Sequence, residues 1–259
     1  MIVPAAFIAQ DAPADQREEV IERSGAPSPN VLPAANVPVL RRGTELILFD
    51  LGDGGRFQPT EGKLLGALRD ERIDPREVTQ VVLTHAHPDH LWGLRNVAGE
   101  LNFPNADYVI GQTEWDFWTA PDVASRLPEA FRGVVPQTQS DLAAIAHRVR
   151  LLKDGDEVAA GISAVATPGH TPGHLSFAVA GGDGLFITAD ALTHELISVE
   201  HPAWQNGFDY QSDVAIATRQ RLLDRLTHDR MAVLAFHFPF PGLGRIERAG
   251  SGYRYTAAR

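Results

Sequence analysis

The sequence predicts an α/β fold, in which buried strands alternate with amphipathic helices, on three observations. Short continuous apolar runs such as Leu46–Phe49 stop at turn residues, as buried strands do. Segments between the runs carry apolar residues at helical spacing, for example at 214, 222, 223 and 226 within Asp213–Leu226. A His or Asp follows several runs, and α/β folds commonly place reactive side chains at strand ends.

The elements follow one another along most of the chain. We expect helices at Thr60–Asp70, Thr113–Leu127, Gln137–Val149 and Asp213–Leu226. We expect buried strands at Leu46–Phe49, Val78–Thr84, Ile162–Thr167, Leu175–Ala180, Gly184–Thr188 and Met231–Phe236. Four of these strands are followed within a few residues by His85, His170, Asp190 and His237, which predicts one composite site.

The chain has 259 residues, of which 44% are hydrophobic, and this is enough for one well-buried core. We expect a single domain over residues 37–259, because no Ser/Gly/Pro-rich linker separates two smaller ones. Residues 1–36 are expected to form an N-terminal extension, packed on the domain or partly irregular, with one short helix near Asp15–Arg23. Regular structure is expected to begin near Val37.

Composition excludes several classes of function. The net charge of −10 disfavours a nucleic-acid partner, because binding to phosphate backbones relies on clustered Lys and Arg. The absence of Cys excludes disulfides, thiolate ligands and Cys nucleophiles, so any metal site must use His and carboxylates. The apolar stretch Ile2–Ala9 is too short to span a bilayer and follows no Lys or Arg. We therefore expect no membrane partner and a cytoplasmic location, unless a leader has been removed.

The first cluster of metal-ligand residues is His85-Ala-His87-Pro-Asp89-His90. Two imidazoles two residues apart on extended backbone face the same side. Asp89 and His90 lie on the turn beyond and can face a second ion a few Å away. The spacing therefore predicts a site for two metal ions.

The second cluster is Thr167-Pro-Gly-His170-Thr-Pro-Gly-His174, in which the Pro-Gly pairs fix tight turns. His170 is the better ligand candidate. His174 is expected to hydrogen-bond its own loop or to orient a ligand. Taken alone, Asp190 would be a helix cap and His237 an ordinary hydrogen-bonded histidine. Beside the other histidines, we interpret Asp190 as a carboxylate that bridges two ions and His237 as a ligand.

In the order of these residues, the chain resembles the metallo-β-lactamase superfamily from about Val37 to the C-terminus. The resemblance implies an αβ/βα four-layer sandwich with two mixed β-sheets flanked by helices. Within the superfamily the chain looks most similar to the methyl parathion hydrolase branch, on the segments Phe103–Ala106, Asp116–Trp118, His237–Gly244 and Gly252–Arg254.

The resemblance also implies roles for individual residues. One ion would be held by His85, His87 and His170, and the other by Asp89, His90 and His237, with Asp190 bridging. Aromatic side chains would line a leaving-group pocket, with core packing as the alternative for each: Phe57, Trp118 and Phe131.

The segment after the bridging carboxylate departs from a related branch. Acyl-homoserine lactonases carry a Tyr shortly after that Asp, whereas this sequence runs Asp190-Ala-Leu-Thr-His194. This argues against a lactonase assisted by Tyr. We place His194 among the pocket residues. His194 and His201 could reach the pocket rim, although for both we favour a surface position.

The predicted function is a dinuclear metal-dependent hydrolase of a small-molecule ester, lactone or phosphotriester. A hydroxide shared by two ions would attack the substrate, with Asp89 and Asp190 as the catalytic carboxylates. Zn²⁺ is the default metal, and Mn, Co or Fe would fit the same ligands. The alternatives are an iron-dependent sulfur dioxygenase, a thioesterase similar to glyoxalase II, or a binding protein with an inactive site. A homodimer is implied by resemblance alone.

Overall fold

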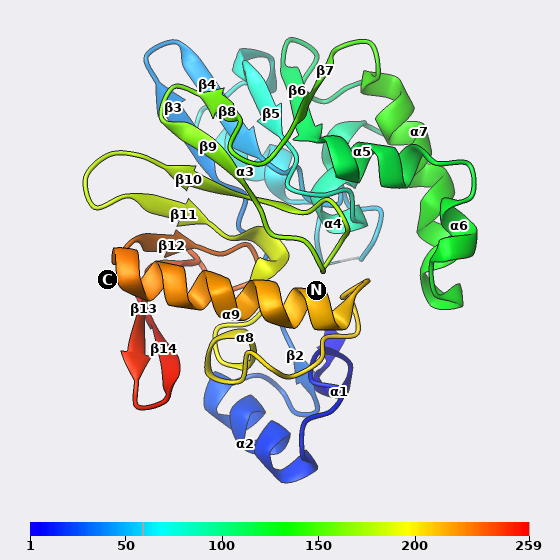
Figure 1. Ribbon diagram of the computed structural model, residues 1–259. Coiled ribbons are helices and arrows are strands. Elements are labelled where there is room, and N and C mark those ends of the chain that lie inside the picture. The colour runs from blue at the N-terminus through cyan, green and yellow to red at the C-terminus, as the bar shows by residue number, and fades with distance from the viewer. Residues whose placement is uncertain (59, 259) are drawn as a thin grey trace. The chain divides into compact units, whose positions relative to one another are not determined.

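The structure is a computed structural model that describes residues 1–58 and 60–258 (Figure 1). Pro59 and Arg259, both inside the domain predicted at 37–259, lie outside the described residues. The chain divides into two compact units, which we name the central unit (Val37–Val158) and the terminal unit (Met1–Asn36 with Ala159–Arg259). The single domain at 37–259 with an extension at 1–36 stays a prediction.

The central unit contains a five-stranded mixed sheet in the order β3-β4-β5-β6-β7. Its middle strands are parallel, and only β3 pairs with its neighbour in the antiparallel sense. Residues Leu46–Phe49 of the predicted first strand are at most 1% exposed, which explains their uninterrupted apolar pattern. The strands are β3 (Val39–Arg42), β4 (Glu45–Phe49), β5 (Gln80–Val82), β6 (Asp107–Gly111) and β7 (Val149–Leu152).

Short helices follow the strands of the central unit. The helix predicted at Thr113–Leu127 is two helices, because Ala120 precedes Pro121 and adopts extended backbone with ψ 134°. Pro88 starts a one-turn helix directly after His87, as the fixed φ of proline favours. The helices are α3 (Leu64–Asp70), η1 (Pro75–Glu77), α4 (Pro88–Leu91), η2 (Trp92–Leu94), α5 (Gln112–Thr119), α6 (Val123–Arg126), η3 (Glu129–Val134) and α7 (Val135–Ile145).

The terminal unit contains most of a seven-stranded mixed sheet in the order β14-β13-β12-β11-β10-β9-β8. The pair β11–β12 is parallel, whereas β9 to β11 and β12 to β14 pair in the antiparallel sense. The edge strand β8 (Glu157–Ala159) spans the boundary between the units. The other strands are β9 (Ile162–Ala166), β10 (Leu175–Val179), β11 (Leu185–Ile187), β12 (Ala232–Leu234), β13 (Leu243–Ala249) and β14 (Gly252–Ala257).

Helix α9 (Ser212–Asp229) covers one face of this sheet (Figure 1). Its buried residues Leu222, Leu223 and Leu226 pack with Phe186 of β11 and Val233 of β12. Between β11 and α9 lie the short helices η4 (Ala189–Ala191) and α8 (Ile197–Glu200).

Residues 1–36 also contain regular structure, so the expectation that it begins near Val37 is wrong. The helix predicted at Asp15–Arg23 is present as α2 (Ala14–Ser24). Around it lie β1 (Val3–Pro4), α1 (Ala5–Ile8) and β2 (Asn30–Val31), and β1 pairs with β2. These elements are too short to show a period in the sequence, and they are held by a buried cluster that includes Val20, Ile21 and Ile197.

Among the described residues, no helix combines the length and the apolar character that crossing a membrane requires.

Candidate metal centre

The central unit gathers four of the predicted ligands at one end of its sheet. His85 follows β5, His87 precedes Pro88, and Asp89 and His90 lie in the single turn of α4. His85 and His90 are fully buried, and Asp89 is 7% exposed. A strand end followed at once by a helical turn therefore places the whole motif in one small region.

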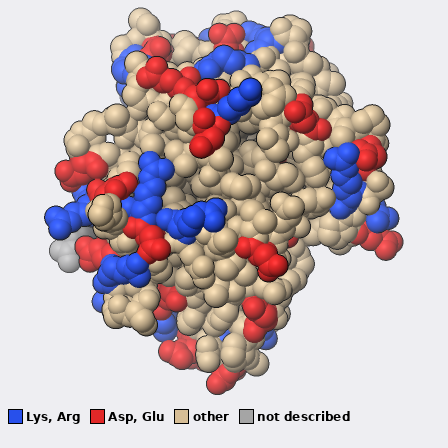
Figure 2. Space-filling model, in the orientation of Figure 1, with Lys and Arg blue, Asp and Glu red and all other residues tan. Residues whose placement is uncertain are grey.

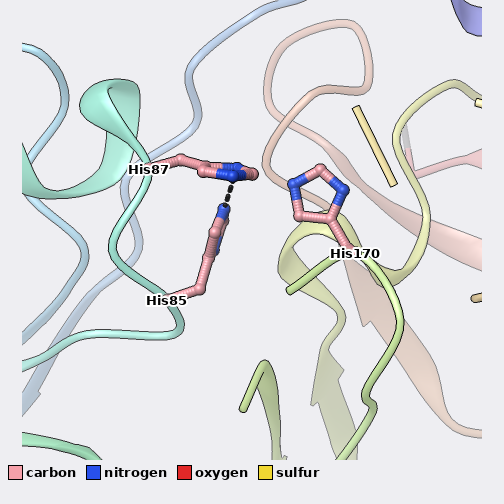
Figure 3. A group of neighbouring side chains, drawn as sticks. All are labelled: His85, His87 and His170. Carbon is pink, nitrogen blue, oxygen red and sulfur yellow. Dashed lines mark hydrogen bonds between the residues drawn. The ribbon is translucent and has the colours of Figure 1, made fainter. Parts of the chain in front are cut away.

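The four side chains of this motif lie against one another. His85 Nε2 is 3.1 Å from His87 Nδ1, with the two rings edge to face (Figure 3). The ring centroids of His85 and His90 are 4.1 Å apart. His90 Nε2 is 3.6 Å from Asp89 Oδ2. Three imidazoles and a carboxylate thus share one volume, which is the chemistry of a site for a divalent ion.

Asp50, which follows β4, fixes the orientation of two of these rings. His90 Nδ1 donates to Asp50 Oδ2 at 2.8 Å, and the hydroxyl of Thr84 donates to the same oxygen at 2.8 Å. Thr84 Oγ1 then accepts from His85 Nδ1 at 3.0 Å. The Nδ1 atoms of His85 and His90 each donate a hydrogen bond to a protein oxygen. Nε2 is therefore the nitrogen of each ring that is suited to bind a metal. Burial raises the pKa of Asp50, while the contact with His90 opposes that rise.

Glu114 of α5 supports the motif from a second side. Its buried Oε1 accepts from the backbone N of Ala86 at 3.0 Å and from Trp118 Nε1 at 2.7 Å. The ring of Trp118 lies 5.9 Å from the ring of His87. Glu114 therefore holds both the backbone between the two histidines and the aromatic ring beside His87.

The terminal unit gathers the other three predicted ligands around Asp190. This carboxylate lies in η4, just after β11, while His170 lies in the turn after β9 and His237 after β12. Asp190 Oδ2 is 3.1 Å from His170 Nε2 and 3.3 Å from His237 Nε2. All three residues are at most 7% exposed. The structure thus places the predicted bridging carboxylate between two predicted histidine ligands.

Both histidines of this group are oriented through Nδ1, as in the central unit. His170 Nδ1 lies 3.1 Å from Asp209 Oδ1, and Arg219 donates to Asp209 Oδ2 at 3.0 Å. His237 Nδ1 donates to the carbonyl oxygen of Ala34 at 2.8 Å. Burial works against protonation of His170, but Asp190 and Asp209 outweigh it and raise its pKa to about 9. The two carboxylates therefore favour positive charge at this position.

His174 hydrogen-bonds its own loop, as predicted, and it also positions Asp190. Its Nδ1 lies 2.8 Å from Thr167 Oγ1, and its Nε2 accepts from the backbone N of Asp190 at 3.1 Å. His174 is fully buried. Both ring nitrogens have protein partners, which is consistent with an orienting role and not with that of a ligand.

The donor set fits divalent metal ions. It consists of imidazole nitrogens and carboxylate oxygens, the donors that Zn²⁺ accepts when thiolates are absent. The described residues include groups of three such side chains that could hold an ion.

The predicted pocket residues have different environments. Trp118 is 1% exposed, Phe131 is partly buried, and Phe57 is 36% exposed with its ring 6.0 Å from the ring of Trp92. Core packing therefore describes Trp118 but not Phe57. The surface position favoured for His194 is wrong, because the residue is 5% exposed. His201 is partly buried and stacks on Trp204 with centroids 3.9 Å apart.

Sequence reasoning missed the residues that orient the ligands. Asp50 follows a predicted strand, as Asp190 does, so its position was a usable signal. Glu114, Asp209 and Arg219 carry no such signal, because each acts through a partner distant in sequence. The carbonyl of Ala34 could not be found from side-chain patterns at all.

Charged side chains are mixed in sign on one face of the protein. On the face drawn in Figure 2, described Lys and Arg residues lie interleaved with Asp and Glu. This pattern, like the net charge of −10, lacks the one-signed basic surface that typically binds a phosphate backbone.

Comparison with known proteins now identifies the class. The sequence profile of the metallo-β-lactamase superfamily matches residues 32–237. An uncharacterised protein of Mycobacterium leprae is 29% identical over 223 residues, which cover 83% of this chain and 88% of that protein. A β-lactamase-like protein 2 homolog of Drosophila melanogaster is 27% identical over 191 residues, 73% of this chain and 56% of that protein. The chain therefore belongs to the metallo-β-lactamase superfamily.

Solved structures support the same conclusion. AidC, described as a dizinc quorum-quenching lactonase, matches with a TM-score of 0.93 at 25% identity and covers 100% of this chain and 91% of its own. The hydrolase AbOPH matches with the same score and coverage at 27% identity. The predicted fold, with mixed sheets flanked by helices, is confirmed. The narrower resemblance to the methyl parathion hydrolase branch receives no support from these comparisons.

Proposed function

We propose that the protein is a dinuclear metal-dependent hydrolase that cleaves an ester, a lactone or a phosphotriester. In this proposal seven side chains hold two ions. His85, His87 and His170 would hold one ion, Asp89, His90 and His237 would hold the other, and Asp190 would bridge them.

The orientation of the histidines carries the proposal. The Nδ1 atoms of His85, His90, His170 and His237 each contact a protein oxygen at 2.8 to 3.1 Å, which supports Nε2 as the nitrogen that would bind metal. Histidines that bind metal characteristically use the other ring nitrogen in this way. Because the contacts come from Thr84, Asp50, Asp209 and a backbone carbonyl, they form within each unit separately.

Each residue of the proposed site would have its own role in the reaction. When bound, two divalent ions would lower the pKa of a shared water to about 7 and polarise the C=O or P=O bond under attack. Asp190 would fix the distance between the ions, and Asp89 would orient the attacking oxygen. Asp50 and Asp209 would keep the histidines in place while charge changes during the reaction.

The substrate class is supported by likeness to solved proteins. AidC is a lactonase whose structure contains N-hexanoyl-L-homoserine as product, and AbOPH is a hydrolase. We therefore place carboxylic esters and lactones first and phosphotriesters second. Zinc is the proposed metal, because the donors are imidazole and carboxylate and because AidC is described as dizinc.

Metal analysis combined with a substrate panel tests the proposal. The panel contains a p-nitrophenyl ester, a γ-lactone, a homoserine lactone, paraoxon, a cephalosporin and lactoylglutathione. We expect two zinc equivalents per chain and turnover of an ester or lactone. A single iron per chain with oxygen uptake on a persulfide would instead identify a sulfur dioxygenase, and preference for lactoylglutathione would identify a thioesterase.

The bridging role has its own test. Asp190→Asn should release at least one metal equivalent and abolish turnover, because an amide oxygen is a poor bridge between two cations. Asp183→Asn, at a side chain that is 77% exposed, is the matched control and should change neither quantity. If Asp190→Asn keeps both metals and full activity, the bridging assignment is wrong.

A further inference from the structure

The end of the N-terminal segment (residues 1–36) is hydrogen-bonded along the chain that carries His237. His237 Nδ1 donates to the carbonyl oxygen of Ala34 at 2.8 Å, and Ala34 N donates to the carbonyl oxygen of His237 at 3.4 Å. Two residues later, Asn36 N donates to the carbonyl oxygen of Phe236 at 2.9 Å. A proposed ligand therefore takes its Nδ1 partner from a residue 203 positions away in the sequence.

The side chain of Asn36 binds the backbone on both sides of His237. Asn36 is 8% exposed, and its Nδ2 donates to the carbonyl oxygens of Ala235 at 3.1 Å and of Phe238 at 2.7 Å. Because Ala235 and Phe238 are fully buried, loss of the amide would leave carbonyl groups without these donors at a cost in stability. A Cβ at Gly242 would lie 2.6 Å from Asn36 Nδ2, so the chain after His237 returns closely against the amide.

Hydrogen bonds, and not apolar packing, hold the segment between Val31 and Asn36. None of residues 32–35, all of which the structure describes, is buried, and Leu32 is 54% exposed. Before this stretch, Val31 packs in the buried cluster that also contains Val20 and Ile21. The segment thus leads from a buried anchor to the proposed ligand, and Asn36 fixes its far end.

We propose that Asn36 is a positioning residue for the metal centre, which keeps the Ala34 carbonyl at His237 Nδ1 and thereby strengthens binding of the ion assigned to His237. This role rests on the proposed function. A neutral imidazole that loses its acceptor at Nδ1 can carry its hydrogen on Nε2 instead, and Nε2 is then unable to bind metal. The N-terminal segment in this way controls the occupancy of one ion and leaves the other ion unaffected.

Asn36→Ala removes both side-chain donors and retains the backbone N–H of residue 36. We expect the dissociation constant of one zinc ion to rise about 10- to 100-fold, as is typical when a metal ligand loses its hydrogen-bond partner. Val20→Ala is the matched control, because Val20 is 2% exposed in the same N-terminal segment and its truncation destabilises the fold. The control should lower the thermal midpoint and bind both zinc ions as wild type does.

Chelator competition measures the two zinc dissociation constants, and calorimetry of the metal-free proteins measures the loss of stability. Weak binding of one ion by folded Asn36→Ala, with both ions retained by Val20→Ala, supports the proposal. The proposal is overturned if Asn36→Ala binds both ions within about threefold of the control, or if it weakens both ions equally.

A double-mutant cycle with His237→Ala tests whether Asn36 acts through His237. If it does, Asn36→Ala in the His237→Ala background should change the affinity of the remaining ion by less than about threefold. An undiminished effect in that background would mean that Asn36 only supports the fold, and the positioning role would be wrong.

Hydrogen exchange of the wild-type protein provides a readout that depends on neither variants nor activity. Coupling between two sites is reciprocal, so zinc must protect the contacts that strengthen its own binding. Removal of zinc should accelerate exchange of the Ala34 and Asn36 amides about 10-fold or more, and exchange of the α2 amides by less than about threefold. Equal acceleration in the two places overturns the proposal, even if Asn36→Ala fails to fold.

Failure of the proposed function gives a different result. If wild type binds two zinc ions but hydrolyses no ester or lactone, the proposed reaction is wrong, while the zinc dissociation constants still decide the role of Asn36. If wild type is an active hydrolase and Asn36→Ala matches the control, only the role of Asn36 is refuted. A wild type that binds no divalent metal refutes both.

Discussion

Asp50 is a single buried carboxylate on which two predicted ligands depend. We expect Asp50→Asn to weaken zinc binding about 10- to 100-fold, because an amide has one acceptor oxygen, whereas the carboxylate accepts from His90 and the Thr84 hydroxyl at Oδ2 and from the Thr84 backbone N at Oδ1. The backbone should tolerate the change, since Asp50 has φ 63° and asparagine adopts that region readily. Zinc affinity measured by chelator competition checks the prediction, with the exposed Asp107→Asn as control. Equal affinity in the two variants would contradict it.

The pKa of His194 predicts how stability depends on pH. Its folded pKa is about 4, below the ordinary value of 6.5, so the unfolded chain binds the proton more readily. The neutral His194 ring therefore contributes its full stabilisation of the folded protein above pH 6.5. This stabilisation, roughly 3 kcal/mol in total, is lost as pH falls towards 4. Urea unfolding of metal-free wild type and His194→Asn between pH 7 and 4 measures it. As pH falls, the free energy of unfolding of wild type should decrease relative to that of the variant. A constant difference between the two free energies would contradict the prediction.

At the scale of single residues, the sequence predicted which candidate ligands lie together far better than which residues orient them. The spacing of His85, His87, Asp89 and His90 within six residues is a local pattern, and the structure brings all four together. Asp209, in contrast, acts on a histidine 39 positions away and is itself held by Arg219. Such pairs depend on how distant segments pack, which no local pattern records.

Among the elements, the turn before His170 is set by one glycine packed against α9. Gly169 has φ +128°, and a Cβ at this position would collide with the backbone N and Cα of Ala215. We expect Gly169→Ala to lower the free energy of unfolding by about 2 to 4 kcal/mol, from strained backbone and overpacking together. It should also weaken zinc binding, because His170 is the next residue.

Gly66→Ala is the matched control for this change. Gly66 lies inside α3, has no left-handed φ, and a Cβ there would meet nothing within 4 Å. The control should stabilise the protein by about 0.4 to 1 kcal/mol, since alanine favours a helix and restricts the unfolded chain. Urea denaturation of both variants decides the matter, and a Gly169→Ala protein as stable as wild type would refute the account of this turn.

The predictions of helices and strands were correct where the element is long or fully buried. The strand at Leu46–Phe49 and the helix at Asp213–Leu226 appear as β4 and α9. The hairpin β13–β14 was missed, although β13 alternates between buried and exposed residues at its start. That alternation covers few positions and competes with charged residues such as Arg248. Short elements in residues 1–36 were missed because they depend on distant partners such as Ile197.

For the whole molecule, the proposed ions predict stabilisation by metal. Ligands that bind only the folded chain stabilise it in proportion to the logarithm of their concentration, by about 4 kcal/mol at 1,000 times Kd. Removal of metal with a chelator should therefore lower the thermal midpoint by several degrees, and added zinc should restore it. Calorimetry before and after dialysis against a chelator tests this. An unchanged midpoint, with metal loss verified by elemental analysis, would argue against ions bound at the predicted ligands.

At this scale the sequence predicted the superfamily fold, because its ligands recur in a characteristic order along the chain. It did not predict that residues Met1–Asn36 pack in the same unit as Ala159–Arg259. The backbone contacts that join them, such as Gly207 N to Phe7 O at 2.8 Å and Asn36 N to Phe236 O at 2.9 Å, involve no characteristic side chain. Main-chain pairing of this kind leaves no trace in composition or spacing.

This shared unit has a consequence for synthesis on the ribosome. Residues 1–36 emerge before their packing partners, which follow only after the 122 residues from Val37 to Val158. At about 5 to 20 residues per second, the wait lasts roughly 6 to 24 s. During that interval Val20, Ile21 and Val31, each at most 2% exposed in the folded protein, lack Ile197, which completes their buried cluster. The nascent chain therefore exposes part of this apolar cluster, which favours binding by chaperones that recognise short apolar segments.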